Sequence, residues 1–178
     1  MKKLFTVLLF SVLLLSESFA QGFSIGPQVG YYKSKGADEG TMMYGAAMRL
    51  RLADMLGLEA SINYRSESYE DNSITITSYP IMATAMIYVL PIAYSAIGAG
   101  WYNSDIDYSS QLNALGFKDG SNQDFGWHFG GGAELPLGIL TLTADIRYVF
   151  IDYGFDKVPG QDLQSNFYVI TAGVLINL

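Results

Sequence analysis

Apolar and polar residues alternate one by one along most of the chain. Between residues 56 and 65, Leu56 begins a series of apolar side chains at even positions, and Gly, Glu, Ser, Asn and Arg occupy the odd positions. A period of two indicates β-strands with one apolar face. The same pattern recurs, less cleanly in the last two segments, over 23–32, 44–52, 124–135, 139–150, 167–178, 74–89 and 92–102. The alternation therefore predicts eight strands and an all-β fold.

The connections between these segments alternate in length. Short connections fall at 53–55, 90–91 and 136–138, and long ones fall near 34–42, 66–73, 103–123 and 152–166. Tight turns at one end and long loops at the other are typical of an antiparallel up-and-down barrel. Strands of about ten residues match the 9–11 residues of a tilted transmembrane strand. The sequence predicts an eight-stranded transmembrane β-barrel.

Alternation alone does not say which face points outward, and a soluble lipocalin-like barrel would keep its apolar face inside. Only 15% of the residues are charged, against about 25% in soluble domains. The four lysines after residue 20 lie in or beside long connections rather than along strands. The polar face is rich in Gly, Ser, Thr and Asn, which suits a crowded interior. We therefore expect the apolar face to contact lipid, with Met82 and Met86 candidates for the inner face.

Aromatic residues gather where the predicted strands meet the long connections. Such a concentration is typical of the aromatic girdle at a membrane interface. The predicted girdle consists of Tyr31, Tyr44, Tyr64, Trp101, Tyr102, Phe125, Trp127, Tyr148, Phe150 and Tyr168.

The first twenty residues have the features of a signal peptide. Lys2 and Lys3 precede a nearly unbroken apolar run from residue 4 to 15, and Ser18-Phe19-Ala20 supplies small residues at the positions that a signal peptidase reads. We expect cleavage after Ala20 and a single barrel domain over 21–178. Removal of residues 1–20 changes the formal net charge from −7 to −8, which argues against nucleic acid as a partner.

The segment from Phe125 to Leu137, FGWHFGGGAELPL, and the closing YVITAGVLINL at 168–178 resemble small outer-membrane β-barrel proteins. The size class is that of the OmpA transmembrane domain and OmpX. The resemblance implies an outer-membrane location, lipid as surroundings, and insertion by the barrel assembly machinery. Many such barrels end in an aromatic residue that this machinery recognises, whereas this chain ends in Leu178.

Charged residues with the parity of the polar face are balanced. Four arginines and four acids share that face, and we expect them to pair and close the lumen because an unpaired buried charge is costly. If the first short turn is symmetric about Asp54, Arg49 faces Glu59. The predicted interior network, with the single histidine, is Arg49, Arg51, Glu59, Arg65, Asp124, His128, Glu134, Asp145 and Arg147.

His128 is the one candidate centre for catalysis. The third short turn places it opposite Asp145 or Arg147, depending on whether residues 136–137 or 137–138 form the turn. A His128–Asp145 pair could act as a general base, but an interior hydrogen-bond network explains the same residues. The chain has no cysteine, and no spacing indicates a metal or cofactor site. Gly130, Gly131 and Gly132 lie within a predicted strand, where they favour bending or close packing.

The leading interpretation is a non-enzymatic outer-membrane barrel whose acidic loops serve surface interaction or envelope integrity. Eleven acids against four lysines give the long connections a charge of −7. Its expected partners are outer-membrane lipid, the assembly machinery and an envelope or surface protein. The alternative is a narrow-lumen barrel that binds or transports a small molecule, with an apolar molecule among the candidates.

Overall fold

The computed structural model describes residues 22–34, 40–69, 74–109, 120–151 and 166–178. Their eight strands are β1 (Phe23–Ser34), β2 (Thr41–Ala53), β3 (Leu56–Tyr69), β4 (Ile74–Leu90), β5 (Ala93–Tyr108), β6 (Gly120–Leu137), β7 (Leu140–Ile151) and β8 (Phe167–Asn177). The expected signal peptide, 1–20, lies outside the described residues. In the described part of the chain, no helix is long and apolar enough to cross a membrane.

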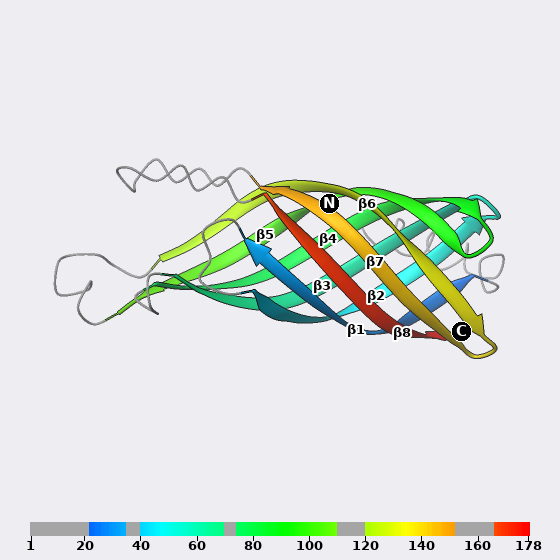
Figure 1. Cartoon of the computed structure of the whole chain (residues 1–178), viewed down its shortest axis with the longest axis horizontal. Coiled ribbons are helices and arrows are strands. Elements are labelled where there is room, and N and C mark those ends of the chain that lie inside the picture. Colours follow the sequence, from blue (N-terminus) through cyan, green and yellow to red (C-terminus); the bar gives the residue numbers. More distant parts are fainter. Residues whose placement is uncertain (1–21, 35–39, 70–73, 110–119, 152–165) are drawn as a thin grey trace, which may run out of the picture.

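The strands form one closed barrel. Each strand pairs in antiparallel fashion with its neighbour in the sequence, and β1 pairs with β8 to complete the ring (Figure 1). Short turns join β2 to β3, β4 to β5 and β6 to β7 at one end, which we call the turn end; the opposite end is the loop end. The predicted eight-stranded up-and-down barrel is confirmed.

The loop end is uneven because β3, β4, β5 and β6 are longer than β1, β7 and β8. Three of these strands, β3, β5 and β6, also extend beyond the bounds that the sequence pattern predicts. Residues 66–69, 103–108 and 120–123, expected in connections, belong to β3, β5 and β6. The β6–β7 ladder ends at Gly126 and Ile151, whereas the β5–β6 ladder continues to Ile106 and Gly120. We call this extension, residues 66–69, 74–78, 103–108 and 120–124, the protruding sheet (Figure 1). The strict alternation fades here because a sheet beyond the lipid needs no apolar outer face.

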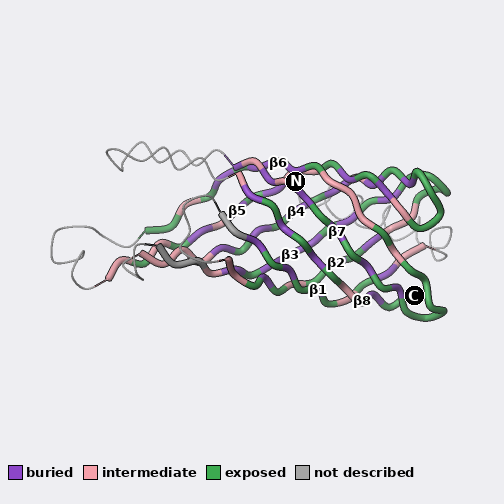
Figure 2. The backbone as a smooth tube through the Cα atoms, viewed as in Figure 1, coloured by how far each residue is buried: buried purple, intermediate pink, exposed green. Residues whose placement is uncertain are grey.

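The two faces of the wall have opposite chemistry, and inward and outward positions alternate along each strand (Figure 2). In β3 the apolar even positions such as Leu58 and Ile62 are exposed on the outside, and Glu59, Ser61 and Asn63 are buried inside. An exposed apolar band around a closed barrel is the surface that lipid requires. In β4, whose facing the sequence left open, the candidates Met82 and Met86 are buried in the lumen.

Candidate functional site: a charge network in the lumen

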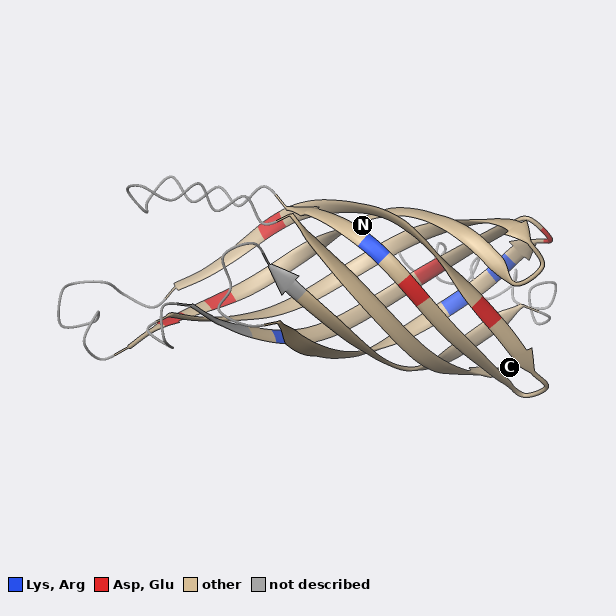
Figure 3. Cartoon of the chain, in the orientation of Figure 1, with Lys and Arg blue, Asp and Glu red and all other residues tan. Residues whose placement is uncertain are grey.

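Opposite charges meet in the turn-side half of the lumen, where Figure 3 shows coloured segments from several strands close together. The β2–β3 register places Arg49 opposite Glu59, the pair that a symmetric turn predicts. The Arg49 guanidinium donates from Nε to Glu59 Oε2 at 2.8 Å, and its Nη2 lies 2.7 Å from the same oxygen. Both side chains are buried.

Two residues of β7 complete a ring of alternating charge with this pair. Arg147 reaches Glu59 Oε1 at 2.8 Å and Asp145 Oδ1 at 3.0 Å. Asp145 Oδ2 lies 3.0 Å from Arg49 Nη2. Tyr94, from β5, donates its hydroxyl to Asp145 Oδ1 at 2.6 Å. The ring spans the lumen because its members come from strands on opposite walls.

A second layer lies nearer the turn end. Arg51 Nη1 donates to Glu134 Oε1 at 2.9 Å, and the Tyr88 hydroxyl donates to Glu134 Oε2 at 2.9 Å. The Arg51 guanidinium carbon also lies 3.7 Å from the centroid of the Tyr88 ring, a cation–π geometry. Arg49 links the two layers through a 3.4 Å contact with Glu134.

We call these residues the lumen network: Arg49, Arg51, Glu59, Tyr88, Tyr94, Glu134, Asp145 and Arg147. Its three arginines balance its three acids, so the formal charge is zero. Neutrality matters because a charge taken out of water must be paired to be tolerated. An eight-stranded barrel is only wide enough for its own side chains, and the network occupies that width.

The loop-side half of the lumen is filled differently. Its buried apolar residues, which we call the loop-side cluster, are Tyr32, Met43, Met82, Tyr102, Val149, Ile151, Phe167 and Val169. The Arg65 guanidinium lies within this cluster, 4.6 Å from the Phe167 ring centroid and 5.0 Å from that of Tyr32. A cavity of about 20 Å³ remains between the cluster, Arg65 and Arg147, which is room for about one water molecule.

Arg65 and Asp124 were predicted in one network with the other charges, and the structure places them elsewhere. Both are buried on the inner face, but Arg65 lies six residues above Glu59 on β3, about 20 Å along the strand. Asp124 accepts two hydrogen bonds from Asn122 at 2.9 and 3.0 Å. The even or odd number of a residue gives the face of the strand on which it lies, but it does not give the position of the side chain along the barrel axis.

His128 faces neither predicted partner. The third turn consists of Gly138 and Ile139, because Leu137 pairs with Leu140, and the register then sets His128 opposite Val149. Gly138 has φ of 71°, a conformation that glycine adopts freely in tight hairpin turns. The fully buried His128 ring forms a 2.9 Å hydrogen bond between Nε2 and Thr84 Oγ1. The proposed His128–Asp145 general-base pair is absent from the described residues.

The pattern did not single out Tyr88, Tyr94 and Thr84, which complete these contacts from β4 and β5. Both faces of these strands are largely apolar, so the alternation gave no inner face for their polar groups. Gly132, opposite Asp145, leaves space for this arrangement. A Cβ atom there would lie 2.7 Å from the Tyr94 hydroxyl oxygen and 2.8 Å from Asp145 Oδ1.

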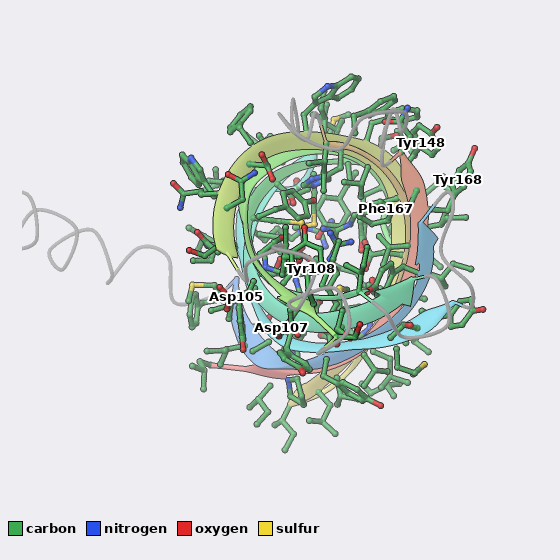
Figure 4. The ribbon with its side chains drawn as sticks, turned by 90° about the vertical axis from the view of Figure 1, so that its left-hand side faces the viewer. Asp105, Asp107, Tyr108, Tyr148, Phe167 and Tyr168 are labelled. Atoms are coloured by element: carbon green, nitrogen blue, oxygen red, sulfur yellow. The ribbon has the colours of Figure 1, made fainter. Side chains whose placement is uncertain are left out.

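Aromatic side chains cover the outer wall in the loop-side half. Trp127 stacks on Phe150 with 4.1 Å between ring centroids, and Tyr148 lies 4.5 Å from Tyr168. In Figure 4, Tyr148 and Tyr168 lie outside the ring of strands and Phe167 lies within it. The other predicted girdle residues on the outer wall are Tyr31, Tyr44, Tyr64, Trp101 and Phe125.

Tyr102 is an exception to the predicted girdle. It is only 2% exposed and belongs to the loop-side cluster inside the lumen. Trp101 and Tyr102 are adjacent, so they point to opposite faces of β5, and only Trp101 faces lipid. Tyr79 and Phe129 are exposed aromatics of the outer wall that the predicted girdle left out. Among the described residues, no group of His, Asp and Glu side chains has the arrangement of a metal site.

An apolar outer band, an aromatic belt and a closed lumen define a small barrel of the outer-membrane type. The chain belongs to the outer membrane protein beta-barrel domain family, whose model matches residues 4–175. This agrees with the resemblance stated from the sequence. A comparison with curated protein sequences found no match.

Solved structures of outer-membrane proteins share the fold at low identity. Neisserial surface protein A is 18% identical with a TM-score of 0.63, and the match covers 88% of this chain and 97% of that protein. OprG from Pseudomonas aeruginosa is 15% identical with a TM-score of 0.55 over 90% and 98% of the two chains. A major outer membrane protein from Thermus thermophilus is 12% identical, with a TM-score of 0.53 over 86% and 98%.

Proposed function

We propose that the protein is a non-enzymatic surface-interaction protein of the outer membrane, with a barrel that anchors rather than conducts. The observation that carries this proposal is the lumen network. Arg49, Glu59, Asp145 and Arg147 join opposite walls through contacts of 2.7 to 3.0 Å. A solute would have to break several buried ion pairs to pass. The part of the protein that binds a partner is then the surface outside the membrane.

The protruding sheet is the described part of that surface. Beyond Trp101 and Phe125 the β5–β6 ladder continues for five further pairs, to Ile106 and Gly120. The β4–β5 ladder reaches Ile74 and Tyr108. A sheet fixed by ladders to a closed barrel is a rigid platform, and rigid platforms bind with less loss of conformational entropy.

The charge of this platform favours a cationic partner. Asp105 and Asp107 are exposed on the outer face of β5, and Figure 4 shows them at the edge of the loop end. In sequence, the connection 70–73 between β3 and β4 adds Glu70 and Asp71, and the connection 109–119 between β5 and β6 is neutral. The outer-membrane protein Ail from Yersinia pestis, 14% identical with a TM-score of 0.50, was crystallised with the heparin analogue sucrose octasulfate. The acidity of this chain favours the opposite charge in its partner.

Binding to charged surfaces tests this proposal. Protein in vesicles of uncharged lipid is expected to bind a polylysine surface, to bind a heparin surface weakly, and to dissociate from polylysine as salt rises. The double variant Asp105→Asn with Asp107→Asn is expected to dissociate at lower salt. Asp54→Asn, an exposed acid at the opposite end of the barrel, is the matched control and should behave as the wild type. Equal binding to both surfaces, or an unchanged double variant, contradicts the proposal.

Export and insertion follow the same proposal. Residues 1–20 act as a cleaved signal peptide, and the barrel assembly machinery inserts the mature chain. The mature protein should fractionate with the outer membrane, begin at Gln21, and migrate faster on a detergent gel unboiled than boiled. Recovery in the periplasmic fraction without a heat-dependent shift would contradict this route.

The loop-side cavity supports a second candidate function, the binding of a small apolar molecule. Met43, Met82 and Phe167 line it, and methionine adapts to irregular shapes. Its volume of about 20 Å³ is far below the roughly 300 Å³ of ordinary ligand pockets, so this candidate requires the cluster to rearrange. Planar-bilayer recordings separate the two: an anchoring barrel gives no steady conductance, whereas solute-dependent current would favour transport.

A further inference from the structure

The turn end of the barrel is apolar as far as the tips of its turns. Met55 in the first turn is 65% exposed, Ile139 in the third is 75% exposed, and the terminal Leu178 is 68% exposed. In the second turn, Ile92 is 48% exposed. Tight turns in water are normally polar. Within residues 53–55, 90–92, 138–139 and 178, Asp54 is the single charged residue.

Part of the backbone of these turns is hydrogen-bonded within the protein. In each turn one carbonyl oxygen accepts a hydrogen bond from a backbone N–H of the strand beside it. The bonds are Tyr88 N to Met55 O at 2.9 Å, Glu134 N to Ile92 O at 2.8 Å, and Asn177 N to Ile139 O at 2.9 Å. Turn carbonyls in water can bond solvent, whereas polar groups in lipid need protein partners.

Two side chains add to this protection. Asn177 donates from Nδ2 to Gly138 O at 2.8 Å, and Arg51 donates from Nη2 to Asp54 O at 3.0 Å. The first and third turns therefore each have two bonded carbonyls. Exposed apolar side chains and internally bonded carbonyls are independent observations, and both suit apolar surroundings.

The outer wall near the turns has no aromatic belt to mark a membrane boundary. On the turn-side half of the outer face, Phe23 is the single aromatic residue among those described. The apolar band continues without interruption from Leu135 and Leu137 into Ile139. From Trp127 in the aromatic belt to Leu137, the height is about 25 Å at about 3.3 Å per residue and a tilt of about 40°. That is the height of the apolar band of an outer-membrane barrel, so the band ends at the turns.

We propose that the exposed apolar side chains of the three turns and Leu178 lie in the periplasmic leaflet where headgroups meet phospholipid acyl chains, with the Asp54 carboxylate among the headgroups, instead of projecting into the periplasm. The partner of the apolar turn end is the lipid itself, because this surface is continuous with the lipid-facing wall. The barrel is then set asymmetrically in the membrane, with its turn end submerged and its protruding sheet raised above the opposite surface.

Depth-dependent fluorescence quenching tests the proposal. A background with Trp101→Phe and Trp127→Phe removes both native tryptophans. Ile139→Trp and Met55→Trp then report on two separate turns. Ile62→Trp, on the lipid-facing wall of β3, is the reference for full immersion, and Asp107→Trp, on the protruding sheet, is the reference for water. Each variant is inserted into phosphatidylcholine vesicles with acyl chains brominated near the headgroup or near the chain end, and the unboiled gel shift confirms folding.

Ile139→Trp and Met55→Trp are expected to emit at short wavelength and to lose most of their emission to bromine near the headgroup. The bromine near the chain end should quench Ile62→Trp more strongly than the turn variants. Emission and quenching like those of Asp107→Trp at both turns would overturn the proposal. So would weak quenching in vesicles combined with a shielded, blue-shifted emission in native membranes, because a protein partner would then cover the turns.

Discussion

The two halves of the lumen solve the same packing problem with different chemistry. The turn-side half joins Arg49, Glu59, Asp145 and Arg147 through buried ion pairs. The loop-side half packs methionine and aromatic side chains around Arg65, with a cavity of about 20 Å³. Ion pairs require fixed geometry, so the first half is intolerant of the loss of one partner. Apolar contacts are less directional, so the second half can adjust.

This difference suits the two ends of the molecule. In the proposed function, the lumen network bars passage at the level where the outer wall is apolar. The loop-side cluster lies beneath the protruding sheet, where methionine side chains can accommodate movement of the neighbouring strands. If the comparison is correct, single changes in the two halves should differ in size, in coupling and in the way that a second change repairs them.

The largest expected effect is the loss of Glu59. Glu59→Ala leaves Asp145 as the one ring carboxylate for both Arg49 and Arg147, so one buried positive charge loses its partner. We expect the free energy of unfolding to fall by about 3–5 kcal/mol. Urea titration of the protein folded in lipid vesicles, followed by tryptophan emission and gel shift, measures it. Ser61→Ala, two residues along the same buried face of β3, is the matched control and should have a small effect. A Glu59→Ala variant as stable as this control would show that the ion pairs do not hold the lumen.

A cavity in the loop-side half should cost less and should be repairable. Met43→Ala removes a buried side chain from the loop-side cluster, and we expect a loss of about 2–5 kcal/mol. Met43→Leu keeps most of the volume and should stay within about 1.5 kcal/mol of the wild type. The same urea titration measures both. If Met43→Leu were as damaging as Met43→Ala, the loop-side half would be as exacting in geometry as the lumen network.

The Tyr94 hydroxyl gives a smaller, local test of the network. Tyr94→Phe removes the 2.6 Å hydrogen bond to Asp145 and keeps the ring, and a hydrogen bond to a charged group is worth about 1.5–3 kcal/mol. Tyr44→Phe, on the exposed outer wall, is the control. A neutral Tyr94→Phe would mean that the arginines alone satisfy Asp145.

The sequence predicted the wall of the barrel well because lipid acts on every strand in the same way. Each strand must turn alternate apolar residues outward, so the period of two gave the strand number. The low charge and the positions of the lysines gave the outer face, and the symmetry of the first short turn gave the Arg49–Glu59 pair. Where lipid is absent the pattern weakens. Residues 103–108 were therefore expected in a connection, although they extend β5.

The interior could be predicted only in part, because parity fixes the face of a strand but not the height or the register. Arg65 has the parity of Glu59 yet lies in the other half of the lumen. His128 was placed opposite Asp145 or Arg147, and the two-residue turn at Gly138 and Ile139 shifts it to Val149. Tyr102 was assigned to the girdle because β5 is apolar on both faces. Contacts across the lumen, such as Tyr94 to Asp145, depend on closure of the barrel.

The smallest expected effect is the coupling between the halves, and it tests the comparison most directly. Met43 pairs with Arg65 on β3, six residues from Glu59, or about 20 Å along the strand. Changes at sites this far apart usually add to within about 0.5 kcal/mol. We therefore expect the loss in a Met43→Ala, Glu59→Ala double variant to equal the sum of the single losses.

Arg49→Ala with Glu59→Ala should instead lose less than the sum, by about 0.5–3 kcal/mol, because the second change removes a charge that the first left unpaired. Because the double variants can unfold, both cycles are repeated with milder changes, Met43→Leu in place of Met43→Ala and Arg49→Lys in place of Arg49→Ala. Strong coupling between Met43 and Glu59 would mean that the lumen is one packed unit, and the division into two halves would be wrong.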